Sequence, residues 1–283
     1  MKFLKLKFFT FVLLVLNLHP LHSNESIEPF TLLTIPKSGS HLTIKALHFM
    51  TGGVPIWHTK FPSAFYISPK KGFLYTHLCI SPGLEDDYAH LPKLKKIINV
   101  RDLRDVAISM VHQILANFWP GMSYEEREAF KKASFDEQLL WVINYDYEVQ
   151  DKEPGTLQVS LTKIGEQIRR YCQDPRNLIC KYENLAGKEA GGSEELQIEE
   201  LYRIANYLKI PTSDIDLAQI ASQLYGNENN PFQKGTFKKF KSTFRKGSIG
   251  AWETLFTEEH KAAFKEKHQK TLEILGYEQD ANW

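Results

Sequence analysis

The sequence predicts a three-layer α/β fold, in which helices cover both faces of a central parallel sheet. Short apolar and β-branched runs recur along the chain, and longer segments with helical periodicity separate them. The 283 residues are 42% apolar and 12% aromatic, which is enough to fill one sizeable core. We find no internal repeat and no low-complexity segment. One globular domain over residues 30–283 is therefore expected.

The first unit is a strand, a tight loop and a helix. Residues 30–35 form an apolar, β-branched run that stops at Pro36, which is typical of a buried strand. Residues 37–40, Lys-Ser-Gly-Ser, favour a turn. Apolar residues then recur between 42 and 50 at a spacing that predicts a helix.

The rest of the chain continues the alternation. Further strands are expected at 72–77, 96–100 and 177–182. Helices are expected at 105–118, 134–147, 194–208, 214–224 and 257–275. Surface loops or lids are expected at 57–71, 183–192 and 226–247.

The N-terminus has the order of a signal peptide. Three lysines, at positions 2, 5 and 7, precede an apolar run at 8–18, and a small residue follows at Ser23. This run is shorter than the ~20 residues that a membrane-spanning helix needs. We expect residues 1–23 to be a signal peptide or a short signal-anchor, which would bring the chain into the secretory pathway for export or membrane association. The alternative is a plain N-terminal extension on a cytoplasmic protein.

Charge and cysteine content exclude several classes of protein. Lys and Arg (35) nearly balance Asp and Glu (34), so nothing in the overall charge favours nucleic acid as a partner. Cys79, Cys172 and Cys180 include no CxxC pair, which argues against a structural zinc or a disulfide scaffold and favours free thiols. Because the overall charge is balanced, any anion site must come from a local group of basic residues or N–H groups.

Residues 36–40 form the first candidate anion site. A strand that leads through a small-residue loop into a helix N-terminus directs free N–H groups and the helix dipole at the loop. Lys37 adds a cation and Gly39 allows an oxygen to approach the backbone closely. The GxxxxGK[ST] loop of nucleotide triphosphatases is absent, and by itself Lys-Ser-Gly-Ser is more often an ordinary turn.

Two other segments could bind a phosphate. Arg101 stands where the strand at 96–100 ends, and Ser109 follows on the next helix, so both could reach one phosphate. The alternative is that Arg101 pairs with Asp105 and Ser109 faces water. Arg245, Lys246 and Gly247 end a run, 234–246, that holds five Lys and one Arg and no acidic residue; a solvated basic loop is the alternative there.

Five segments carry a resemblance to a known family. They are, in chain order, Pro36-Lys-Ser-Gly-Ser40, Tyr75-Thr-His-Leu78, Arg101 to Ser109, Lys181-Tyr-Glu-Asn-Leu185 and Arg245-Lys-Gly-Ser-Ile-Gly-Ala-Trp252. They resemble, in the same order, the PKSGTT, KTHL, RNPKDVAVS, YEDL and RKGxxGDW motifs of the sulfotransferases of the cytosolic type, which use 3′-phosphoadenosine 5′-phosphosulfate (PAPS). The resemblance runs from about residue 30 to the last helix and implies a Rossmann-like fold with a P-loop-like 5′-phosphosulfate loop.

The resemblance also implies a function and a role for each matched residue. The chain would move a sulfuryl group from PAPS to a hydroxyl or amine acceptor, without a metal. Lys37 would bridge to the transferring sulfuryl group and the leaving phosphate, and His77 would be the general base. The 5′-phosphate would be held by Ser38, Gly39, Ser40 and His41. The 3′-phosphate would be bound by Arg101, Ser109, Arg245, Lys246 and Gly247, and Tyr182 would contact the adenine.

The chain departs from the family pattern at several positions. His41 and Leu42 stand where the family has a second Thr and a Trp that stacks on adenine, and Ala251 replaces an Asp. Two other functions remain open from the residues: a nucleotide-dependent kinase of related fold, and a secreted protein that binds nucleotide without turnover. The sequence leaves the acceptor and the oligomeric state open.

Overall fold

The computed structural model describes residues 27–53, 94–116, 123–146, 160–226 and 247–283 in full, and the backbone of 56–58 and 73–77. The leader at 1–23 and the loop at 226–247, apart from Gly226 and Gly247, lie outside the described residues. Cys172 and Cys180 are free thiols, as expected, and Cys79 is not described. Among the helices that the structure describes, none has the length and apolar content to cross a bilayer.

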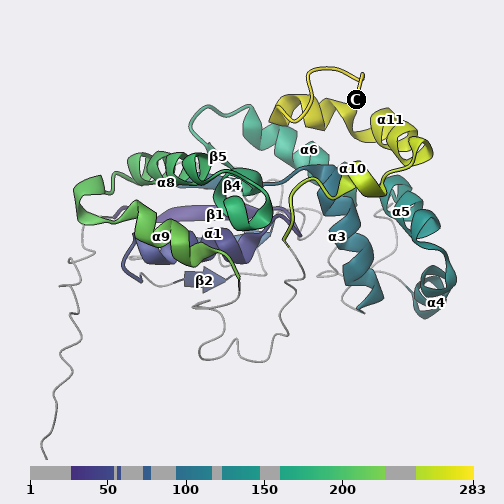
Figure 1. Cartoon of the computed structure of the whole chain (residues 1–283), viewed down its shortest axis with the longest axis horizontal. Helices are drawn as coiled ribbons and strands as arrows, with labels where there is room; N and C mark the ends of the chain where they lie inside the picture. Colours follow the sequence, from purple (N-terminus) through teal and green to yellow (C-terminus); the bar gives the residue numbers. More distant parts are fainter. Residues whose placement is uncertain are drawn as a thin grey trace, which may run out of the picture.

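The predicted three-layer α/β fold is confirmed (Figure 1). Within the described residues, five parallel strands form one sheet in the order β2-β3-β1-β4-β5. The strands are β1 (Phe30–Thr34), β2 (Ile56–His58), β3 (Phe73–His77), β4 (Lys95–Val100) and β5 (Leu178–Lys181). β1 lies in the middle of the sheet, with the next two strands of the chain on one side of it and the last two on the other.

Helices cover both faces of the sheet because its central strands are apolar on both sides. Leu32 and Ile97 pack with α1 (Ser40–Met50), α8 (Glu194–Leu208) and α9 (Leu217–Leu224). Leu33 and Ile98 pack on the opposite face, and the helices there are α3 (Leu103–Leu115), α4 (Tyr124–Lys132), α5 (Phe135–Asn144), α6 (Leu161–Cys172) and α11 (Glu258–Leu275). Adjacent residues of a strand thus face different cores, as expected for a sheet buried on both sides.

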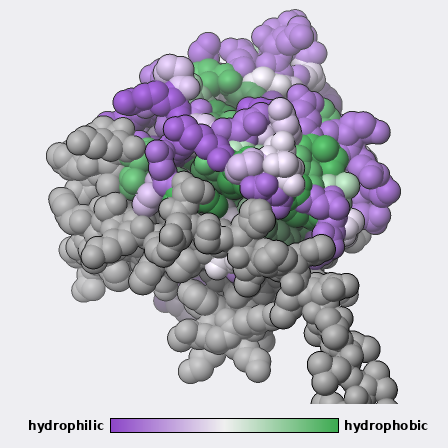
Figure 2. All heavy atoms as spheres, turned by 90° about the vertical axis from the view of Figure 1, so that its left-hand side faces the viewer, coloured by the Kyte–Doolittle hydropathy of each residue, from purple (hydrophilic) through white to green (hydrophobic). Residues whose placement is uncertain are grey.

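Helix ends follow local sequence signals. α5 begins after Ser134, whose hydroxyl accepts from the N–H of Glu137 while the Glu137 carboxylate accepts from the N–H of Ser134. Thr257 caps α11 through the N–H of His260, as the sequence indicated. α8 has the bounds that were expected. The described surface on the left-hand side of Figure 1 mixes hydrophilic and hydrophobic areas (Figure 2).

Several local expectations were wrong. Residues 57 and 58 belong to β2, whereas the whole segment 57–71 was expected to be a loop. The expected loop at 183–192 contains most of α7 (Tyr182–Ala186) and the short helix η4 (Lys188–Ala190). α4, α6 and α10 (Trp252–Leu255) were not expected from the sequence. The start of α9 was expected at Asp214, which instead ends a separate short helix, η5 (Thr212–Asp214).

Candidate functional site

The carboxyl ends of three strands meet at one edge of the sheet. Thr34 of β1 is the register partner of His77 in β3 and of Asn99 in β4. The 36–40 loop and Arg101 follow these ends within two residues. The connection after β1 leads to β2 on one side of the sheet, and the connection after β4 leads to β5 on the other side. The carboxyl ends of β1 and β4 therefore flank the switch point at which open α/β sheets form their ligand crevice.

The 36–40 loop is fixed from beneath by hydrogen bonds between uncharged groups. The Ser38 hydroxyl donates to the Ile35 carbonyl (2.7 Å), and the Asn99 side-chain amide donates to the carbonyl (3.0 Å) and hydroxyl oxygens (3.1 Å) of Ser38. The Ser40 hydroxyl donates to the Thr34 hydroxyl at 2.8 Å. Both serine hydroxyls therefore donate to groups of the protein, which leaves backbone N–H groups and the Lys37 ammonium as the loop's donors to an anion.

The backbone of the loop curls into an anion-binding shape. Lys37 (φ 67°) and Gly39 (φ 82°) are both left-handed and flank Ser38. The first N–H groups of α1 have no partner within the helix, and within the described residues no side chain caps it. Successive N–H groups in such a turn, at a helix N-terminus, form a concave site for negative charge.

Tyr182 joins the loop to the chain near the C-terminus. Its ring lies so close to Gly39 that a Cβ atom there would stand 2.3 Å from Cδ2 of the ring. Its hydroxyl donates to the Gly247 carbonyl at 2.5 Å. Burial raises the pKa of Tyr182 to about 12, so the phenol stays a neutral donor. A side chain at position 39 is excluded by this contact as well as by the positive φ.

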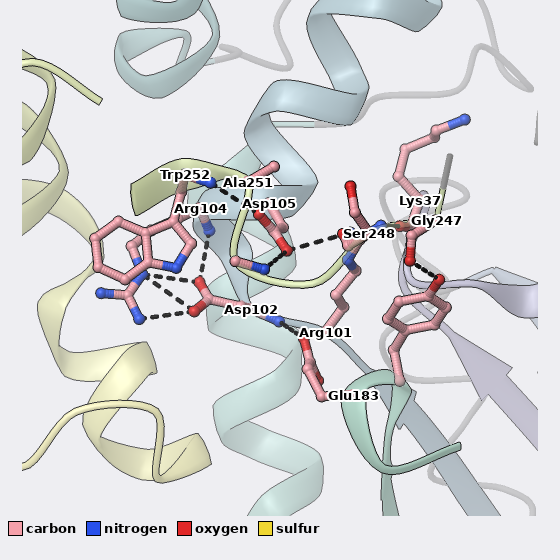
Figure 3. A network of polar contacts seen from close by, with 12 residues as sticks. Lys37, Arg101, Asp102, Arg104, Asp105, Glu183, Gly247, Ser248, Ala251 and Trp252 are labelled. Atoms are coloured by element: carbon pink, nitrogen blue, oxygen red, sulfur yellow. Dashed lines mark hydrogen bonds and ion pairs between the residues drawn. The ribbon is translucent and has the colours of Figure 1, made fainter. Parts of the chain in front are cut away.

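Arg101 connects the same segments through its guanidinium group (Figure 3). Nη2 donates to the Ser248 carbonyl (2.7 Å) and to Asp105 (3.2 Å), and Nη1 lies 3.5 Å from the Lys37 carbonyl. The guanidinium carbon is 4.5 Å from the centre of the Tyr182 ring. The pairing with Asp105, considered above as an alternative, is therefore present. Nε of Arg101 is buried and has no hydrogen-bond partner among the described residues, so this N–H donor is unsatisfied.

Asp105 organises the segment that faces Arg101. Besides Arg101, its carboxylate accepts from the N–H groups of Gly250 (3.0 Å) and Trp252 (3.1 Å). Burial raises its pKa, while Arg101 and the two N–H groups act against that rise. This role of Asp105 was not expected from the sequence. The i,i+4 spacing of Arg101 and Asp105 was the available signal, and nothing in the sequence linked Asp105 to residue 250.

The remaining predicted residues lie around this cluster or outside the described part. Ser109 is half-buried on α3, two turns along from its start. The Lys37 side chain extends away from Arg101 (Figure 3). His41 is an exposed residue, yet partial desolvation of its ring and the charge of Lys37 lower its pKa. Arg245, Lys246 and the side chain of His77 are not described; the backbone of His77 ends β3. The described residues contain no group of three or more His, Cys, Asp or Glu suited to a metal.

Comparison with known proteins identifies one family and a similar fold. The family model of the sulfotransferase domain matches residues 58–276. Among solved structures, the chain is similar to mouse sulfotransferase SULT7A1 complexed with PAP, with a TM-score of 0.56 and 19% identity, over 87% of this chain and 84% of that one. No curated protein matches. The family match includes Arg101, Tyr182 and Gly247 and begins after the 36–40 loop, whose assignment rests on its own geometry and motif.

Proposed function

This chain belongs to the sulfotransferase family, and from that premise we propose that it transfers a sulfuryl group from PAPS to a hydroxyl or amine acceptor. One observation carries the proposal. Segments that are far apart in the sequence, at Lys37, Arg101, Tyr182 and Gly247, form one contact cluster at the carboxyl edge of the sheet. A donor with phosphates at its 5′ and 3′ ends needs two anion sites on one crevice, and this cluster supplies a loop for one and an arginine for the other.

The 36–40 loop is proposed to hold the 5′ end of the donor. Negative charge moves onto the leaving phosphate during transfer, and the N–H groups of Gly39, Ser40 and His41 with the Lys37 ammonium are suited to stabilise it. A left-handed conformation costs a lysine about 1–2 kcal/mol. Such strain at residue 37 is consistent with a functional requirement on this backbone.

The 3′-phosphate is assigned to Arg101, Ser109, Arg245, Lys246 and Gly247, with Tyr182 on the adenine side. The buried Nε of Arg101 supports this assignment, because an unpaired guanidinium donor fits an anionic ligand. In this scheme lysine and arginine supply the positive charge, and no step depends on a metal.

His77 is proposed to take the proton from the acceptor. Its backbone stands at the end of β3, in register with Thr34, so it belongs to the strand edge from which the 36–40 loop starts. An imidazole has a pKa near neutrality, which suits proton removal from a hydroxyl or amine as the new S–O or S–N bond forms. Lys37, on the opposite side of the transferring group, would stabilise the charge that the leaving oxygen gains.

Calorimetry with adenosine 3′,5′-bisphosphate, compared with ATP plus Mg²⁺, tests the proposal. We expect the bisphosphate to bind more tightly, and PAPS to be consumed when hydroxyl or amine acceptors are added. Tighter binding of ATP with Mg²⁺ would favour a kinase. Binding of the bisphosphate with no turnover across acceptor classes would favour a protein that only binds nucleotide.

We also propose that residues 1–23 direct the chain to the secretory pathway. Their order of basic, apolar and small residues supports this. N-terminal sequencing of the protein from a eukaryotic secreting host should give a new N-terminus near residue 24, or an intact leader in the membrane fraction. An intact leader in the cytosol would overturn the proposal.

A further inference from the structure

The residues after α11 contact the N-terminus of α3, which begins just after Arg101 in the chain. α11 ends at Gly276 in a left-handed conformation, and Tyr277, Glu278 and Trp283 then make polar and aromatic contacts around residues 102–104. We call these three residues the C-terminal clamp. None of them belongs to the motifs that indicated the site.

Glu278 and Trp283 of the clamp contact Arg104, a residue that is only 2% exposed. Nη1 of Arg104 pairs with Glu278 at 2.5 Å, and its Nε and Nη2 form a fork with Asp102 at 2.9 and 2.7 Å. The guanidinium carbon lies 3.6 Å from the ring centre of Trp252 and 4.4 Å from that of Trp283. Although burial lowers it, the pKa of Arg104 is raised overall by its hydrogen bonds and charge pairing with the two carboxylates. Arg104 is thus a buried cation that pairs with two carboxylates and lies against two indole rings.

A second contact of the clamp reaches the same turn through Glu183. The Tyr277 hydroxyl donates to one carboxylate oxygen of Glu183 at 2.6 Å, and the other oxygen accepts from the N–H of Asp102 at 2.9 Å. Asp102 is the residue after Arg101 and also the N-cap of α3. Its backbone and its side chain are therefore both held by groups that the clamp contacts.

Trp252 links the clamp to the segment that faces Arg101. Its ring packs edge to face against the ring of Trp283, with centroids 5.4 Å apart, and its backbone N–H donates to Asp105. Asp105 also fixes the N–H of Gly250 and pairs with Arg101, which in turn donates to the Ser248 carbonyl (Figure 3). Contacts thus run without a break from Trp283 through Trp252 and Asp105 to Arg101.

We propose that Tyr277, Glu278 and Trp283 are positioning residues for the 3′-phosphate side of the donor site. They hold Asp102 and Trp252, and through them the orientation of Arg101 and of residues 247–250. The inference rests on the proposed function, because it assigns a consequence for binding of the donor. A purely structural clamp would stabilise the fold without changing the preference for a 3′-phosphate.

The test uses full-length variants and two nucleotides, adenosine 3′,5′-bisphosphate and adenosine 5′-phosphate. We expect Trp283→Ala and Glu278→Gln to weaken binding of the bisphosphate by about 3- to 10-fold and to leave the monophosphate almost unchanged. Trp283→Phe keeps an aromatic face over Arg104 and should restore most of the preference. The matched control is Trp141→Ala, since Trp141 also packs in an aromatic cluster, with Phe130 and Tyr145, on α5. It should lower the Tm and leave the ratio of the two Kd values unchanged.

Amide hydrogen exchange gives a readout that needs no ligand. The N–H groups of Gly250 and Trp252 should exchange faster in Trp283→Ala than in the wild type, and at the wild-type rate in Trp141→Ala. A wild-type preference for the bisphosphate that survives both clamp variants would overturn the inference and leave the proposed function standing. A wild type without that preference would overturn the proposed function, and the inference with it.

Discussion

The two sides of the candidate crevice are built differently. The 36–40 loop is held by short hydrogen bonds between uncharged groups, from Ser38, Ser40 and Asn99. The opposite side is a set of charged contacts that we call the Arg101 network: Arg101, Asp105, Ser248, Gly250 and Trp252. One side is a backbone loop that is held by local hydrogen bonds. The other side is the guanidinium group of Arg101, whose position depends on contacts with residues far away in the sequence.

This difference suggests a division of work. A cradle of N–H groups that is already in position loses no reorganisation energy when charge develops on it, which suits the end of the donor where the bond breaks. A guanidinium held by Asp105 and Ser248 is suited to recognising a fixed phosphate, because its fork matches the geometry of the phosphate oxygens. Changes near the loop should therefore affect turnover, and changes in the Arg101 network should affect binding.

The sharpest test of this division is His77→Ala, at the strand end beside the loop. Removing the general base should reduce turnover by about 10²- to 10⁴-fold. Binding of adenosine 3′,5′-bisphosphate should stay within about twofold, since His77 is assigned no contact with it. Turnover is measured as release of the bisphosphate from PAPS with a phenolic acceptor. His48→Ala, at the last turn of α1, is the control and should keep turnover. If His77→Ala abolished binding, the base assignment would be wrong.

The next largest effect is expected from Gly39→Ala. An added Cβ meets the Tyr182 ring and also requires a left-handed alanine, so strain and overpacking together should cost about 2–5 kcal/mol. Donor binding should be lost with stability, because the cradle itself is displaced. Gly191→Ala is a matched control: its φ is also positive (91°), but a Cβ there would meet nothing within 4 Å. It should cost only about 1–2 kcal/mol and leave binding intact. Equal losses in the two variants would show that the Tyr182 contact has no effect.

The same contrast explains what the sequence could predict. The residues of the 36–40 loop are adjacent, so strand, turn and helix signals could be read together. α8 was predicted with its bounds because its apolar spacing is regular and Ser193 caps it. Apart from the Arg101–Asp105 pair, the Arg101 network could not be predicted, since its other hydrogen bonds join residues about 145 positions apart. β2 was missed because three residues carry too little periodicity. The capping box of Ser123 and Glu126, which marks the start of α4, was present in the sequence and was overlooked.

A smaller and more selective effect is expected from Arg101→Lys. Lysine keeps the charge but loses the fork, so binding of adenosine 3′,5′-bisphosphate should weaken by about 10- to 100-fold, as expected for a charged hydrogen bond. Binding of adenosine 5′-phosphate should change much less. The control is Arg176→Lys, because Arg176 pairs with Asp174 through two N–H groups at an exposed site away from the crevice. Calorimetry measures the Kd of each variant for the two nucleotides. An equal loss of affinity for both nucleotides would show that Arg101 does not bind the 3′-phosphate.

The smallest effect concerns the pH dependence of stability on the charged side of the crevice. Burial raises the pKa of Glu183, so above its ordinary pKa the unfolded chain releases this proton before the folded protein does. Its contribution is fully present at low pH and is lost as the pH rises through the raised pKa. Glu183→Gln keeps an oxygen for the N–H of Asp102 and removes the titration. The free energy of unfolding of this variant, from urea titrations between pH 4 and 7.5, should therefore rise relative to the wild type as the pH increases.

Glu258→Gln provides a control of opposite sign for that measurement. A hydrogen bond from Lys261 lowers the pKa of the exposed Glu258, so its contribution is present above the ordinary pKa and is lost as the pH falls. This variant should lose stability relative to the wild type as the pH rises, by a small amount because the pair is solvated. If Glu183→Gln followed the same direction as Glu258→Gln, desolvation would not dominate at Glu183. The hydrogen bonds from Asp102 and Tyr277 would then outweigh desolvation, and the charged side of the crevice would stabilise the buried carboxylate of Glu183 in its ionised form.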